Sequence, residues 1–192
     1  MKNKPFFEKL CLLLGILLLI SAMAIFILWA WNSSNSQQRS EEYVQALDSL
    51  LPEPISAFPE PRRNNTMPVL ALDGVDFVGI LEIPRHGSSL PVCANWGQVY
   101  KYPCQFDGSV YDGSMQIGGT SQKGQYDFYR DISVGDSIFF TDMEGNRFAY
   151  AVTDIHYEKH ADQTALQREE AALTLFIKNI YGFEYIVIFC NT

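Results

Sequence analysis

The chain has few of the residues that build metal centres. Among 192 residues there are 4 cysteines and 3 histidines, with no CxxC pair and no cysteine–histidine spacing that fits zinc. No set of oxygen ligands typical of calcium is legible either. We therefore expect no metal and no cofactor. Cys93, Cys104 and Cys190 allow at most one disulfide among them, and the sequence leaves its pairing open.

Positive charge is also scarce. Beyond residue 31 there are 11 Lys and Arg against 21 Asp and Glu, a formal net charge of −10. A surface of that sign repels phosphate groups, which argues against nucleic acid and anionic lipid headgroups as partners. The exception is the start of the chain, where Lys2, Lys4 and Lys9 lie within nine residues.

A long apolar run begins directly after those lysines. Residues 10–31, "LCLLLGILLLISAMAIFILWAW", hold no charge and no proline, and as a helix they would reach about 33 Å, enough to cross a bilayer. A cleaved signal peptide, the alternative, would have a shorter apolar region of about 7–15 residues. The run predicts a retained single-pass membrane anchor. The lysines of residues 1–9 place the N-terminus in the cytoplasm and residues 32–192 outside.

Residues 32–66 predict an extracellular linker. "NSSNSQQ", residues 32–38, is polar and unpatterned, as in a flexible segment, whereas the spacing of apolar residues predicts a short helix over 40–51. The stretch "LPEPISAFPEPRRNNTMP" then carries five prolines. Proline removes backbone donors and fixes φ, so this stretch predicts an extended spacer.

From residue 67 the sequence is typical of a β domain. Strands are predicted, with the turn "DMEGN" forming a tight hairpin at Gly145, over 77–84, 90–94, 114–120, 136–143, 147–157, 173–178 and 184–190. Residues 161–172 are the only helical stretch of note. The pattern predicts a mainly β fold, a closed barrel of about seven to eight strands with one or two short helices, over residues 67–192.

Three segments of this domain resemble the sortases, membrane-bound cysteine transpeptidases of Gram-positive-type bacteria. "VGILEIPRHGSSLPV" is similar to the family's opening strand pair, Y-x-G-x-L-x-I-P followed by L-P-V. "DISVGDSIFFTDMEGNRFAYAV" is similar to L-x-x-G-D-x-I-x-x-x-D-x-x-G-x-x-x-x-Y-x-V, and "LTLFIK" stands where the family has T-L-x-T-C. The resemblance implies a sortase-like barrel.

The resemblance also implies a site made of a Cys nucleophile, a His acid/base and an Arg that stabilises the oxyanion. In this chain Lys178 stands at the Cys position, Thr120 at the His position and Tyr185 at the Arg position, with Glu184 one step away. All three departures imply a catalytically inactive pseudo-sortase at the cell surface. Such a protein would bind a sorting signal, a pilin or an active sortase.

Three interpretations of Lys178 stay open. It is a solvated strand end, or a positive contact for a peptide carboxylate, or part of a rebuilt centre with the hydroxyl of Thr120 or Ser121. The last would make the chain an active peptidase or transpeptidase, and it requires a desolvated lysine whose pKa falls to ~7–8. We expect the surroundings of the Lys178 ammonium to discriminate among these.

Overall fold

The computed structural model describes residues 4–60, 65–159, 166, 171–182 and 184–192. The chain divides into two compact units, one ending at Asn35 and the other running from Ser36 to Thr192. Each unit is described by itself.

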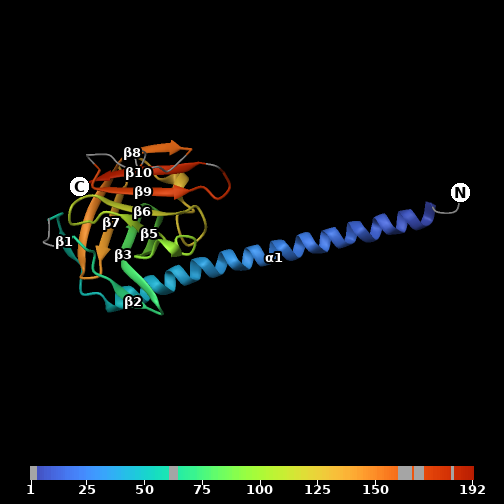
Figure 1. Cartoon of the computed structure of the whole chain (residues 1–192), viewed down its shortest axis with the longest axis horizontal. Coiled ribbons are helices and arrows are strands. Elements are labelled where there is room, and N and C mark those ends of the chain that lie inside the picture. The colour runs from blue at the N-terminus through green and yellow to red at the C-terminus, as the bar shows by residue number, and fades with distance from the viewer. Residues whose placement is uncertain (1–3, 61–64, 160–165, 167–170, 183) are drawn as a thin grey trace. The chain divides into compact units, whose positions relative to one another are not determined.

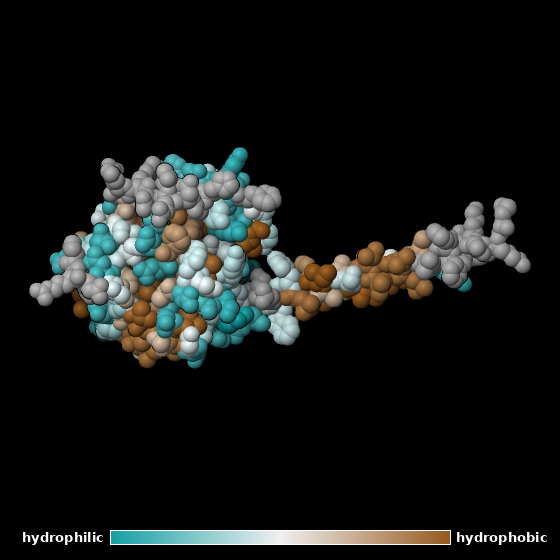
Figure 2. Space-filling model, in the orientation of Figure 1, coloured by the Kyte–Doolittle hydropathy of each residue, from teal (hydrophilic) through white to brown (hydrophobic). Residues whose placement is uncertain are grey.

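The first unit consists of the apolar part of a long helix, α1 (Lys4–Leu50). Large side chains such as Leu13, Leu17 and Leu28 are exposed along it, and Figure 2 shows this hydrophobic surface. In the part of the chain that the structure describes, α1 alone is long and apolar enough to cross a membrane, judged by length and composition. Apolar side chains without protein neighbours suit a lipid environment, so the helix is compatible with a membrane anchor.

Helix α1 continues through residues 32–38, which corrects the prediction of a flexible start there. Two side-chain pairs at helical spacing support this part: Gln37 donates to Glu41 at 3.0 Å and Gln38 donates to Glu42 at 3.1 Å. The short helix predicted over 40–51 is thus the end of a longer one. This end of the helix belongs to the second unit, where Leu47 is completely buried in one cluster with Phe77 and Ile80.

The second unit is a closed β-barrel (Figure 1). Eight strands follow one another around the ring, in the order β3 (Val75–Ile83), β4 (Ser88–Cys93), β5 (Cys104–Asp107), β6 (Met115–Thr120), β9 (Leu173–Lys178), β10 (Tyr185–Asn191), β8 (Asn146–Glu158) and β7 (Ser137–Asp142). The ring closes where β7 pairs with β3. Two short strands lie outside it, β1 (Ile55–Ala57) along β8 and β2 (Leu70–Leu72) along β3. Among the described residues, three short 3-10 helices connect the strands: η1 (Pro84–His86), η2 (Trp96–Gln98) and η3 (Tyr129–Asp131).

The seven predicted strands and the barrel are confirmed. The structure adds β1, β2 and β5, which the sequence did not indicate. Strand β1 lies inside the proline-rich stretch, so this stretch is not only a spacer: Ile55 N donates to Gly145 O at 2.8 Å at the start of the pairing with β8. Most of the helix predicted over 161–172 lies outside the described residues.

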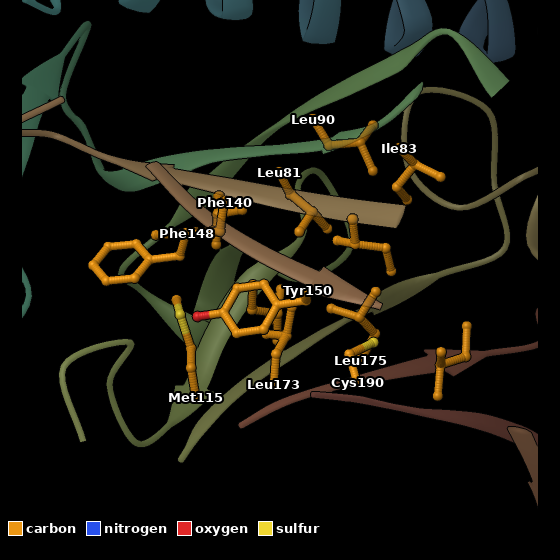
Figure 3. Packing of buried hydrophobic residues seen from close by; sticks show 14 of the residues in the cluster. Leu81, Ile83, Leu90, Met115, Phe140, Phe148, Tyr150, Leu173, Leu175 and Cys190 are labelled. Atoms are coloured by element: carbon orange, nitrogen blue, oxygen red, sulfur yellow. The ribbon is translucent and has the colours of Figure 1, made fainter. Parts of the chain in front are cut away.

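The barrel interior is filled by apolar side chains. Figure 3 shows Met115, Leu173, Leu175, Tyr150 and Cys190 gathered there, and all five are buried. Strand side chains alternate between the two faces of a sheet, so these residues fix which positions of β6, β9 and β10 point outward. Each buried Leu, Ile or Phe contributes about 1.5–3 kcal/mol to the free energy of folding. The barrel is therefore a rigid scaffold for the residues on its outer face.

Candidate functional site

Three neighbouring strands place Thr120, Lys178 and Tyr185 in one row. In the parallel pairing of β6 with β9, Thr120 is opposite Lys178, and in the antiparallel pairing of β10 with β9, Tyr185 is opposite Lys178. Adjacent strands lie about 4.8 Å apart. The structure therefore brings together the three positions that the sequence resemblance singled out, although they come from segments far apart in the chain.

This row points to the outside of the barrel. Met115 and Ile117 of β6 and Leu175 and Ile177 of β9 belong to the interior cluster, so the alternate positions of both strands lie on the outer face. Lys178 is the exposed end of an otherwise buried strand. The site is thus a surface feature built on the pair β6–β9.

A cavity of about 400 Å³ covers the row. Thr120, Lys178 and Tyr185 line it together with Phe176 and Gly119, and the loop of residues 94–103 supplies the opposite wall with Trp96, Gly97, Val99 and Tyr100. A volume of this size fits a few amino-acid side chains of a bound peptide. The cavity therefore lies between a rigid sheet and the loop that connects β4 with β5.

Two glutamines attach this loop to the strand. Gln125 Nε2 donates to Val99 O at 3.1 Å, and its Oε1 accepts from Thr120 N at 2.8 Å. Gln122 Nε2 donates to Tyr100 O at 2.5 Å. Gln125 is almost completely buried, so its two hydrogen bonds connect the loop wall directly to the strand end that carries Thr120.

Trp96 and Phe176 form the apolar side of the cavity, and they belong to a cluster of three aromatic rings. The centroid of Trp96 lies 4.9 Å from that of Phe106 and 5.6 Å from that of Phe176, and Phe106 and Phe176 are 5.3 Å apart. Gly118 lies under this cluster, where a Cβ would come within 2.4 Å of Phe176 Cζ and 2.5 Å of Trp96 Cη2. The rings can pack this closely only over a glycine.

The polar groups of the row differ in their surroundings. Thr120 is 1 % exposed, and its Oγ1 has no hydrogen-bond partner in the described structure. The Lys178 side chain is exposed, and it forms no hydrogen bond or ion pair with any residue that the structure describes. Within the described part of the chain, the hydroxyl and the ammonium beside it therefore have hydrogen-bond donors open to a ligand.

The other two candidate residues serve the turn between β9 and β10. Ser121 Oγ accepts from Ile180 N at 3.1 Å, and Ser121 N donates to Lys178 O at 3.0 Å. Glu184 is exposed, and its backbone O accepts from Asn179 N at 3.1 Å. The Ser121 hydroxyl is thus occupied in a structural contact at the end of the cavity.

The cysteines lie elsewhere. Cys93, Cys104 and Cys190 are buried thiols and Cys11 lies exposed on α1. None of them lines the cavity among the described residues. Burial raises the pKa of the Cys190 thiol to about 12, so this group stays protonated inside the barrel.

The barrel and its outer cavity can be compared with solved structures. Sortase A from Corynebacterium diphtheriae superposes with a TM-score of 0.52 at 16% identity, covering 60% of each chain. The chain has a sortase-like fold. Sortase C1 from Streptococcus agalactiae gives a TM-score of 0.52 at 18% identity over 63% of this chain and 69% of that one. Sortase A from Listeria monocytogenes gives 0.50 at 19% identity over 60% and 86%.

The match spans less than two thirds of the diphtheriae chain. No family model and no curated protein matches the sequence. At these identities the sortase likeness concerns the fold alone, so the roles of Thr120, Lys178 and Tyr185 must be argued from their own chemistry.

The sequence did not reveal the loop wall of the cavity. Trp96 and Tyr100 lie in "ANWGQVYKYP", residues 94–103, which mixes aromatic and polar residues without a strand or helix pattern. Aromatic residues in a segment with no strand or helix pattern were the available signal, because aromatic side chains on loops are frequent at binding surfaces.

Proposed function

We propose that this chain is a surface module that binds an extended peptide in the cavity by non-covalent contacts and carries out no thioester chemistry. The proposal rests on one observation: Lys178, an exposed ammonium, occupies the centre of the row between Thr120 and Tyr185 on the cavity floor. The partner would be a sorting-type peptide, a pilin segment or an active sortase. The apolar part of α1 would hold the module on the outer face of the cell membrane, with the N-terminus in the cytoplasm.

The chemistry of an ammonium supports binding over catalysis. A protonated amine has no lone pair to attack a carbonyl carbon, and a lysine that acts as a base must be desolvated so that its pKa falls. Lys178 is exposed to water. An ammonium and a hydroxyl beside the rings of Trp96 and Phe176 suit a peptide segment that combines a carboxylate with an apolar side chain.

Peptide binding to the full chain in detergent micelles tests this proposal. We expect the anisotropy of an N-terminally fluorescein-labelled L-P-x-T-G peptide with a free C-terminal carboxylate to rise on binding. Lys178→Gln should weaken the affinity about tenfold, as loss of one charge-assisted contact predicts. Lys159→Gln, which removes an exposed lysine at the end of β8, is the matched control and should leave the affinity unchanged. Equal affinities for all three proteins, or no binding at all, would refute the proposal.

One observation favours the alternative, a rebuilt catalytic centre. The Thr120 hydroxyl is buried, has no hydrogen-bond partner among the described residues and is in register with Lys178. If it were a nucleophile, the wild-type chain would cleave the same peptide, and both Thr120→Val and Lys178→Gln would abolish cleavage. Mass spectrometry of the peptide after prolonged incubation decides between the two: an intact peptide supports the binding module.

A further inference from the structure

Cys93 and Cys104 stand opposite each other at the two ends of the loop that walls the cavity. Strand β4 ends at Cys93 and β5 begins at Cys104, and these residues form the parallel pair between the two strands. Cys93 N donates to Pro103 O at 2.8 Å beside them. Neighbouring strands are about 4.8 Å apart, within the ~4.4–6.8 Å that separates the Cα atoms of disulfide-bonded cysteines. The backbone already has the spacing of a crosslink.

The two thiols also face each other. Residues paired across neighbouring strands point to the same face of the sheet, and both cysteines are completely buried in one cluster with Phe77. Cys93 Sγ accepts from Asn95 N at 3.4 Å, and Cys104 Sγ lies 3.3 Å from Tyr102 O. The contact with the Cys104 thiol lowers the pKa of Cys93, whereas the same contact and burial raise the pKa of Cys104. Cys93 is therefore the thiol that ionises first.

We propose that Cys93 and Cys104 form a disulfide that closes the base of the 94–103 loop and fixes the wall of the cavity. The bond would join the two ends of the segment that carries Trp96, Val99 and Tyr100. Cys190 is excluded as a partner for either, since it belongs to the interior cluster of the barrel while Cys93 and Cys104 belong to a separate cluster with Phe77 and Leu47.

The reaction is an exchange with an external disulfide, either a small molecule such as oxidised glutathione or an oxidoreductase. The Cys93 thiolate attacks one sulfur of that oxidant, and the other sulfur leaves as a thiol after taking up the Cys93 proton. Cys104 then attacks Cys93 Sγ, loses its own proton and releases the second thiol. Two protein S–H groups become one S–S bond, and the oxidant is reduced to two thiols. Because both groups are buried in the folded unit, the exchange is expected as the chain folds.

Counting thiols in the full chain tests the crosslink. The detergent-purified chain is denatured, refolded in an oxidised/reduced glutathione buffer, denatured again without reductant and labelled with a maleimide. We expect two labels, on Cys11 and Cys190, and four after reduction. Trypsin should release the peptide of residues 86–101 linked to that of residues 102–123, since Lys101 lies between the cysteines. Four labels without reduction, or a link to Cys190, would overturn the proposal.

Two variants and one rate measurement complete the test. Cys190→Ala should keep the linked peptide, and Cys104→Ser should show no link between Cys93 and Cys190. If a variant fails to fold, the peptide map of the wild type still decides whether Cys93 is linked to Cys104. Lys101 is exposed in the loop, so limited trypsin cleavage there reports loop opening. We expect cleavage about tenfold slower in the oxidised chain. Equal rates in both forms would refute the claim that the bond fixes the wall.

Discussion

Adding one methyl group at Gly118 should displace the aromatic side of the cavity. The new Cβ of Gly118→Ala would lie 2.4 Å from Phe176 Cζ and 2.5 Å from Trp96 Cη2, far inside the contact distance of two carbon atoms. Phe176 is 4 % exposed and packs against Leu166 and Val187, so it has little room to move. Trp96 is 39 % exposed. We therefore expect Trp96 to swing away from the cavity.

The size of the effect follows from two opposing terms. Overpacking of this kind costs about 1–3 kcal/mol, while replacing glycine by alanine in a strand recovers about 0.5–1 kcal/mol of backbone entropy. The free energy of unfolding should fall by about 0.5–2 kcal/mol. Peptide affinity should fall more visibly, because the ring that leaves is part of the proposed binding wall.

Urea unfolding followed by circular dichroism measures the first effect, and peptide anisotropy measures the second. Gly79→Ala is the matched control: its Cβ would lie 2.3 Å from Phe140 Cζ and 2.5 Å from the Thr141 carbonyl oxygen, away from the cavity. It should destabilise the barrel at least as much, because a backbone oxygen cannot swing aside, yet leave the affinity of the folded chain unchanged. Unchanged stability and affinity in Gly118→Ala would refute the reasoning about the aromatic cluster.

Three further substitutions test the barrel and the site. Asp142→Ala should cost about 3–5 kcal/mol in urea unfolding, because its fully buried carboxylate accepts four hydrogen bonds, one of them from Tyr111 Oη at 2.7 Å. Burial alone would raise the pKa of Asp136, but the Arg85 guanidinium at 2.7 Å outweighs it and holds that pKa below its usual value. This contribution to stability is present at neutral pH and is lost as pH falls below about 4, so Arg85→Met should flatten the acid limb of a thermal-unfolding profile. Thr120→Val should raise stability by about 1 kcal/mol and weaken peptide binding, since it removes a buried hydroxyl without a partner in the described structure.

The sequence predicted the long strands because their patterns are strong. Strands β6 and β9 are buried on almost every position, so they hold few charged residues: residues 115–120 have none, and residues 173–178 have only Lys178. Strands β1 and β2 have three residues each and β5 has four, too few for an alternating pattern to stand out. Their pairing depends on distant segments, as where β1 lies along residues 146–148 of β8.

The sequence predicted part of the candidate site. Motif spacing aligned Thr120, Lys178 and Tyr185 with three positions of the sortase pattern, and the barrel register puts them side by side. The sequence did not predict the loop wall, because the position of the loop depends on contacts such as that of Gln125 with Val99, 26 residues apart. Single-sequence patterns report on neighbours within an element and say little about such contacts.

The cavity keeps features that cost stability. A buried hydroxyl without a partner costs about 1–3 kcal/mol, and Thr120 Oγ1 is such a group in the described structure. Trp96 remains 39 % exposed and Tyr100 66 % exposed, so apolar area that packing would stabilise stays in contact with water. If stability alone were selected, a valine at position 120 and a shorter 94–103 loop would remove these features and make the barrel more stable. The peptide binding proposed above would offset all three unfavourable features, because a bound peptide would cover both rings and could hydrogen-bond the hydroxyl.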